Sequence, residues 1–312
     1  MEALGNIFFF QWEVNLIVWL QTNLGPVGAQ LLNHFSLFGE ELTLIFLVGF
    51  LYWSYDKHMA RFVGICALLG LGWNTMAKNI FLRLRPYFAH EEVKLLRVVE
   101  PSEDPYNVVA QGYSMPSAHS TNVVSVFGSI AAWVKKRWMT VLAVVICFFT
   151  GLSRSAVGAH YPTDVMLGWC FGLIAIVLAS FLQKRVKNTL YLFGILFLLM
   201  LPGFFYCRSE DFYTSTGLLL GFGCAMFFEE NKVHFENTRK PLWMILRALG
   251  GLAIYVVLNK LMKMPFSPEF LSGGSQAALM IRFVRYAIIA FVDFGVYPLA
   301  FRLEKGKKAA EA

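Results

Sequence analysis

The sequence predicts an all-α integral membrane protein, a helical bundle of about nine transmembrane spans. Of its 312 residues, 57% are apolar and 16% are aromatic, and the mean hydropathy is +0.56. Charged residues make up 15% of the chain, against about 25% in soluble domains. Apolar runs long enough to cross a bilayer recur along the chain. These observations exclude a soluble enzyme, a disordered chain and a secreted disulfide scaffold.

The spans are predicted from apolar runs between polar breaks, because crossing the hydrocarbon core takes about 20 mostly apolar residues. The first eight candidates are 40–56, 60–81, 117–134, 138–155, 162–182, 189–206, 212–229 and 241–261. A ninth lies near 279–301. The earlier segment Asn6–Leu20 is shorter and carries Gln11, Glu13 and Asn15. We expect this segment to lie on the membrane as an interfacial helix.

The basic residues predict the orientation of the chain. Fifteen of the 27 Lys and Arg residues fall in alternate loops and in the C-terminal tail. They are Lys57, Arg61, Lys135, Lys136, Arg137, Lys184, Arg185, Lys187, Lys232, Arg239, Lys240, Arg302, Lys305, Lys307 and Lys308. The positive-inside rule places these segments in the cytoplasm. The opposite side then holds the N-terminus and the loops 82–116, 155–161, 207–211 and 262–278. Membrane topology thus explains the net charge of +7, and no nucleic-acid partner is expected.

Several absences in the sequence bear on the compartment. The five cysteines lie in or beside apolar runs without a C-x-x-C pair, which favours small core residues over a metal site or disulfides. We expect no cleaved signal peptide, because the first basic residue is Lys57. The sequence has no N-x-S/T acceptor and no terminal di-lysine signal. This favours a multi-pass protein of a bacterial plasma membrane.

Three stretches on the predicted outer side hold the unusual polar residues. The first runs from Lys78 to Pro86, the second from Tyr113 to Ser120 and the third from Ser153 to Asp164. In these stretches Lys78, Arg85 and Arg154 supply about three positive charges, which match a phosphate dianion and its transition state. Ser117 follows Pro116 at a predicted helix start, where free N–H groups favour an anion. The residues therefore predict a phosphate site.

Two histidines in the same stretches could perform the chemistry. His160 and His119 supply a nucleophile and a general acid. Asp164 follows His160 by four residues, about one helical turn. We expect Asp164 to accept the Nδ1–H of His160 and so leave Nε2 free to attack phosphorus.

The pattern K-x6-R-P, then P-S-x-H, then S-R-x5-H-x3-D resembles that of the type 2 phosphatidic acid phosphatase superfamily, with every element in order. The resemblance covers about residues 40–182 and implies a six-helix-type phosphatase core. It also implies that His160 forms a phosphohistidine, that His119 protonates the leaving oxygen and that Asp164 orients His160. The phosphate-binding residues that it implies are Lys78, Arg85, Ser117, Ala118 and Arg154. No metal or other cofactor is implied.

One position departs from the family pattern. Ala118 stands where the family usually has Gly. The backbone N–H survives this change, so a contact to phosphate can persist, while the added methyl group is expected to narrow the substrate range. A Gly also permits a left-handed backbone, which Ala disfavours. If the site required that backbone, activity would be lost.

The sequence therefore predicts a metal-independent phosphatase for a lipid phosphate or pyrophosphate, embedded among membrane lipids, with its site at the outer membrane–water interface. Residues 1–185 would form the phosphatase core with the N-terminal interfacial helix, and residues 186–312 would add further transmembrane helices. Two alternatives stay open. One is a phosphotransferase that passes the phosphoryl or phospho-head group to an alcohol, and the other is a transporter that retains the fold. The substrate and the oligomeric state also stay open.

Overall fold

The computed structural model describes residues 5–97 and 104–301. The C-terminal tail from Arg302, which carries four of the basic residues used to predict the orientation, lies outside the described residues. Within them the chain is helical, and the β pairing is a single isolated bridge between Asn6 and Arg83. The prediction of an all-α protein is therefore confirmed.

The chain forms two compact units that interleave along the sequence, residues 1–43 with 73–176 and residues 44–72 with 177–312. Helices α2, α3 and α9 each contribute to both units, because the boundaries fall inside them. The division of the sequence into 1–185 and 186–312 remains a prediction.

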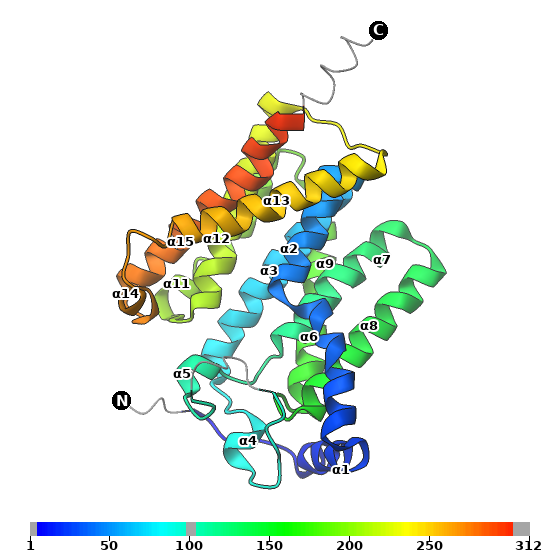
Figure 1. Ribbon diagram of the computed structural model, residues 1–312, viewed down its shortest axis with the longest axis vertical. Coiled ribbons are helices and arrows are strands. Elements are labelled where there is room, and N and C mark those ends of the chain that lie inside the picture. The colour runs from blue at the N-terminus through cyan, green and yellow to red at the C-terminus, as the bar shows by residue number, and fades with distance from the viewer. Residues whose placement is uncertain (1–4, 98–103, 302–312) are drawn as a thin grey trace. The chain divides into compact units, whose positions relative to one another are not determined.

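Unit 1 contains the polar motifs. Its elements are α1 (Gln11–Asn33), η1 (His34–Gly39), the end of α3 (Lys57–Phe81), α4 (Pro86–Ala89), α5 (Val108–Gln111), α6 (Ala118–Val123), η3 (Val124–Gly128), α7 (Ser129–Val134), α8 (Arg137–Ala156) and the first part of α9 (Pro162–Arg185). Within this unit α8 packs against α1 and α6 (Figure 1). The short elements α4 and α5 lie in the long loop that follows α3.

Unit 2 contains the second half of the chain. Its elements are most of α2 (Glu41–Phe50), η2 (Leu51–Tyr55), the start of α3, the end of α9, α10 (Thr189–Leu198), α11 (Gly203–Tyr206), α12 (Glu210–Phe228), η4 (Glu229–Val233), α13 (Pro241–Leu261), α14 (Pro268–Ser272), α15 (Gln276–Phe291), η5 (Val292–Val296) and η6 (Tyr297–Phe301). Here α12 lies along α15 (Figure 1). A Cβ on Gly217 or Gly221 would meet the backbone oxygens of Phe283 and Ala287 at 2.4 and 2.1 Å. This small-xxx-small spacing lets the two backbones approach closely.

Within the part of the chain that the structure describes, five helical segments are long and apolar enough to cross a membrane, and they correspond to five of the predicted spans. They are Lys57–Phe81, Arg137–Ala156, Pro162–Arg185, Thr189–Tyr206 and Pro241–Leu261. A sixth span is added if Gln11–Gly39 and Glu41–Tyr55, bent by 45°, count as one. The predicted total of nine is not confirmed. The candidate 117–134 is divided by the π turn η3, α12 begins with two acidic residues, and α15 has 16 residues before the π turn η5.

The N-terminal helix differs in its bounds from the predicted segment Asn6–Leu20. Residue Asn6 is extended, because its backbone N–H and C=O pair with Leu82 and Leu84 at 2.7 and 2.9 Å. Helix α1 then begins at Gln11 and continues past Leu20 to Asn33, with a break at Gly25, where φ is 63°. Pro26, directly after this glycine, removes a further helical hydrogen bond. The expected location of helix α1 on the membrane surface remains a prediction.

Candidate functional site

Every residue predicted for the site lies in unit 1. Lys78 is in the last turn of α3, and Arg85 follows that helix directly before α4. Arg154 is in the last turn of α8, whereas Asp164 is in the first turn of α9. His160 lies in the short link between these two helices. The three polar stretches are in contact, because Arg85 of the first and Ser114 of the second both approach His160 of the third.

Helices α6 and α9 approach closely where they carry site residues. A Cβ on Gly168 would lie 2.6 Å from the carbonyl oxygen of Ser117, and one on Gly172 would lie 2.7 Å from Cβ of Val124. Both glycines are on α9, and their spacing of four places them on one face. The N–H of Ser117 donates to the carbonyl oxygen of Asp164 at 3.0 Å. The start of α6 is thereby fixed against the start of α9.

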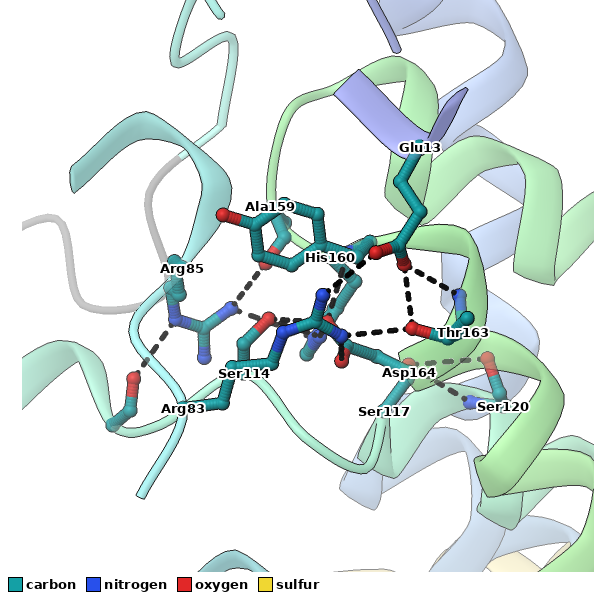
Figure 2. Close-up of polar contacts among 12 residues, drawn as sticks. Glu13, Arg83, Arg85, Ser114, Ser117, Ser120, Ala159, His160, Thr163 and Asp164 are labelled. Carbon is teal, nitrogen blue, oxygen red and sulfur yellow. Dashed lines mark hydrogen bonds and ion pairs between the residues drawn. The ribbon is translucent and has the colours of Figure 1, made fainter. Parts of the chain in front are cut away.

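His160 is almost completely buried, with 2% of its surface exposed. Its Nε2 lies 3.4 Å from Nη1 of Arg85, which also donates to the carbonyl oxygen of Ala159 at 3.0 Å (Figure 2). Because a guanidinium can only donate hydrogen bonds, this contact favours a lone pair on Nε2 and the ring proton on Nδ1. Burial, and then the positive charges of Arg85, Arg154 and Lys78, hold the pKa of His160 well below its ordinary value of 6.5. The ring is therefore neutral, as a nucleophile must be.

The contact between His160 and Asp164 differs in detail from the predicted hydrogen bond. His160 Nδ1 lies 3.7 Å from Asp164 Oδ2, which is longer than a hydrogen bond. Ser114 lies beside both groups, with its Oγ 3.4 Å from Nδ1 and donating to Oδ2 at 2.5 Å (Figure 2). Nδ1–H of His160 can therefore donate to Oγ of Ser114, whose own hydroxyl donates to the carboxylate of Asp164. Ser114 belongs to the second polar stretch, but no spacing in the sequence indicates this contact.

Asp164 is held by a buried charged network that sequence reasoning missed. Arg83 donates from Nη1 to Asp164 Oδ1 at 2.6 Å and from Nη2 to Glu13 Oε2 at 2.9 Å (Figure 2). Glu13 Oε1 accepts from the hydroxyl of Thr163 at 2.5 Å, and the guanidinium of Arg83 stacks 3.8 Å above the ring of Tyr161. Glu13 and Arg83 are 0% and 1% exposed. We call these three charged residues the Glu13–Arg83–Asp164 network. The one available signal was Glu13, the single charged residue in the N-terminal segment Asn6–Leu20.

The other cations surround His160 from different elements. Arg85 donates from Nε and Nη2 to the carbonyl oxygen of Gln111 at 3.1 and 2.8 Å, and from Nε to that of Gly112 at 3.0 Å. Arg154 is 2% exposed, and its Nη1 donates to Oδ1 of Asn33 at 3.2 Å. Its Nε has no hydrogen-bond partner among the described residues. Neutral amide and carbonyl groups thus orient these guanidinium groups, and this arrangement suits binding of an anion.

The start of α6 places the remaining predicted residues. Ser117 is the N-cap of α6, and its Oγ accepts from the N–H of Ser120 at 3.4 Å. Ala118 is the first helical residue, and it is not among the described residues with a positive φ. A left-handed backbone is thus not required where the family usually has Gly. His119 is the second residue of α6.

Comparison with known proteins gives matches over most of the chain. The PAP2 superfamily model matches residues 59–188, and the model described as the transmembrane extension of PAP2 superfamily phosphatases matches residues 213–308. The chain is 28% identical over 163 residues to phosphatidylglycerophosphatase B of Bacillus subtilis (strain 168), an alignment that covers 47% of this chain and 70% of the relative. No solved structure gives a significant match.

Two further relatives match over shorter stretches. Undecaprenyl-diphosphatase BcrC of the same B. subtilis strain is 31% identical over 134 residues, which are 43% of this chain and 60% of the relative. Lipid A 1-phosphatase of Rhizobium etli is 39% identical over 68 residues, which are 22% of this chain and 28% of the relative. The chain therefore spans less than two thirds of the length of both relatives.

Proposed function

We propose, from the premise that this chain belongs to the PAP2 superfamily and is a phosphatase of that superfamily, that it hydrolyses a lipid phosphate or pyrophosphate through a phosphohistidine at His160. The observation that carries the proposal is the state of His160. Its ring is buried and neutral, its Nε2 faces Arg85, and its Nδ1 faces Ser114 and the carboxylate of Asp164. Such a ring is oriented and electronically suited to attack phosphorus.

The reaction follows from these positions. Nε2 of His160 forms a bond to phosphorus while the bond from phosphorus to the leaving oxygen breaks, and His119 gives that oxygen a proton. The carboxylate of Asp164, acting through Ser114, stabilises the positive charge that develops on the His160 ring. Water then attacks the phosphohistidine and loses a proton to His119, which releases inorganic phosphate and restores His160.

The charged oxygens of the phosphoryl group need compensation throughout this cycle. The positive charges of Arg85, Arg154 and Lys78 all act at His160, because each of them lowers its pKa. Fixed positive charges in a buried site stabilise the extra negative charge of the transition state more strongly than water does. Ser117 and the backbone of Ala118, at the start of α6, are the proposed further contacts to the phosphoryl oxygens.

The relatives' names suggest substrates with a long lipid tail. They are called a phosphatidylglycerophosphatase, undecaprenyl-diphosphatases and lipid A phosphatases. We propose that this chain likewise acts on a phosphorylated membrane lipid. A site at the membrane edge suits such a molecule, because its phosphate stays in water while its tail stays in the bilayer.

Phosphate release should persist in excess EDTA. The positive charges of Arg85, Arg154 and Lys78 supply the compensation that a metal ion gives in other phosphatases. The measurement is free phosphate released by the purified protein from phosphatidic acid, phosphatidylglycerol phosphate and undecaprenyl diphosphate. Each substrate is assayed with and without EDTA, and with and without an added alcohol. Activity that requires Mg²⁺ would refute the mechanism. Transfer of phosphate to the alcohol in place of its release would identify a phosphotransferase.

The site should face away from the cytoplasm. We infer this orientation from the basic loops, because moving a short basic loop across the bilayer is disfavoured. A cysteine introduced at the exposed residue Asp104 should react with an impermeant maleimide in intact cells. One introduced at the exposed residue Lys136 should react only after lysis, and the parent chain measures the background from native cysteines. The reverse labelling pattern would place the site in the cytoplasm.

A further inference from the structure

A carboxylate outside the three polar stretches lies beside His119. Glu40 Oε1 is 3.4 Å from Nε2 of His119 and accepts from Nη2 of Arg97 at 2.6 Å. Glu40 connects η1 to α2, at the bend of the N-terminal helix pair. The side chains of Glu40 and His119 are 34% and 22% exposed, but Nε2 of His119 is itself buried and makes no hydrogen bond among the described residues. The family motifs do not include Glu40.

The bend is attached to α6 at several points, which fixes where Glu40 lies. Gly39 packs on His119 so closely that a Cβ there would lie 3.1 Å from Cα and Cβ of the histidine. The side chain of Asn122, one turn further along α6, donates to the carbonyl oxygen of Gly39 at 3.1 Å. Arg97 also donates to the hydroxyl of Ser36 at 2.6 Å. The bend and the start of α6 therefore form one packed group.

We propose that Glu40 is a positioning residue for His119: it faces Nε2 of the ring and favours the protonated form that a general acid needs. The inference rests on the proposed function, because His119 needs a proton only if a leaving oxygen must receive one. A separation of 3.4 Å does not make a good hydrogen bond, but catalytic contacts are often long without substrate and shorten in the complex.

The proton transfers on His119 can be followed atom by atom. With Nε2–H donating to Glu40, Nδ1 carries the proton that passes to the leaving oxygen. His119 is then neutral, with its remaining proton on Nε2 and a lone pair on Nδ1. That lone pair accepts a proton from the water that attacks the phosphohistidine, which restores the imidazolium. Glu40 thus selects the same tautomer for both steps.

The charges around His119 explain why a carboxylate is needed there. Burial, and then the positive charges of Arg154 and Arg97, lower the pKa of His119 from its ordinary value of 6.5 to about 4. Glu40 opposes them. Arg97 moderates this effect, because it pairs with the same oxygen of Glu40. Removing Glu40 and removing Arg97 should therefore change the proton affinity of His119 in opposite directions.

The test compares Glu40→Gln, Arg97→Gln and the matched control Glu41→Gln, which removes the neighbouring exposed carboxylate. Glu40→Gln should lower kcat/KM for a lipid alkyl phosphate by about 10-fold to 100-fold, part of the effect typical of a general acid. The loss on p-nitrophenyl phosphate should be much smaller, because that leaving group departs without protonation. The alkaline limb of the pH profile should move to lower pH in Glu40→Gln and to higher pH in Arg97→Gln.

Equal losses on both substrates, with the alkaline limb unmoved in both variants, would overturn the inference and leave Glu40 a purely structural residue. If Glu40→Gln does not fold, Arg97→Gln tests the inference by itself. Movement of its alkaline limb to higher pH supports the inference, and an unmoved limb or movement to lower pH overturns it. Wild-type phosphate release and its loss in His160→Ala are measured in the same series. Failure of those two results would refute the proposed function itself, whereas failure confined to Glu40 and Arg97 refutes only this inference.

Discussion

Replacing His160 with alanine is expected to abolish phosphate release. Without the imidazole no covalent intermediate can form, and attack by water must proceed without a nucleophile from the protein. The variant should still fold, because the residue lies in a link between α8 and α9 and its loss leaves the Glu13–Arg83–Asp164 network intact. The measurement is phosphate release by purified protein whose thermal unfolding matches wild type. Substitution of the exposed His34 by alanine is the matched control. Near wild-type turnover in folded His160→Ala would exclude the phosphohistidine.

The same experiment can separate the roles of the two histidines. His119→Ala should still form a phosphoenzyme on p-nitrophenyl phosphate, because His119 supplies only the proton for the leaving oxygen and this leaving group departs without protonation. On other substrates the loss of this proton lowers the rate by about 10²- to 10⁴-fold. Because the pKa of His160 lies well below 6.5, its ring stays neutral as the pH falls through 6.5. Phosphoenzyme formation in His119→Ala should therefore show no decline between about pH 7 and pH 6, the range in which an ordinary histidine becomes protonated. A decline centred near pH 6.5 would contradict this account of the nucleophile.

Replacing Arg83 with methionine should destabilise the fold and remove activity together. Arg83 is 1% exposed and bridges two carboxylates that are 0% exposed, so its loss leaves Glu13 and Asp164 buried without their cation. Removing one partner of a buried ion pair lowers stability by about 3–5 kcal/mol. The expected result is a lower thermal unfolding temperature in detergent. Lysine at this position should give an intermediate loss, because a point charge cannot replace a guanidinium that bridges two carboxylates.

A double variant tests whether the lower stability of Arg83→Met comes from the uncompensated charges of Glu13 and Asp164. Adding Glu13→Gln to Arg83→Met removes one of the two uncompensated carboxylates, so the double variant should be more stable than Arg83→Met alone. Residues in one charged network are coupled, whereas independent sites have additive effects. If the stability losses of Arg83→Met and Glu13→Gln simply add in the double variant, Arg83 contributes packing and not charge compensation.

The membrane spans depend on both composition and packing. Composition alone identifies a membrane protein, because a chain with 15% charged residues cannot cover a soluble surface of this size. Five of the predicted spans are long and apolar enough to cross a membrane among the described residues, and one of these five comprises both α10 and α11. The count of nine is not confirmed, since hydropathy does not show the π turns η3 and η5 or the bend before Glu41. These interruptions depend on how a helix packs, which local composition does not encode.

The sequence by itself determined the membrane class, the family pattern and the residues that gather in unit 1, because each of these depends on composition or on short spacings. Only the tertiary structure decided which groups orient them. Ser114 lies between His160 and Asp164, Glu13 reaches Asp164 through Arg83, and Glu40 faces His119. These contacts join residues tens of positions apart. A periodic pattern reports which face of one helix is apolar, whereas such contacts arise from the packing of several helices at once.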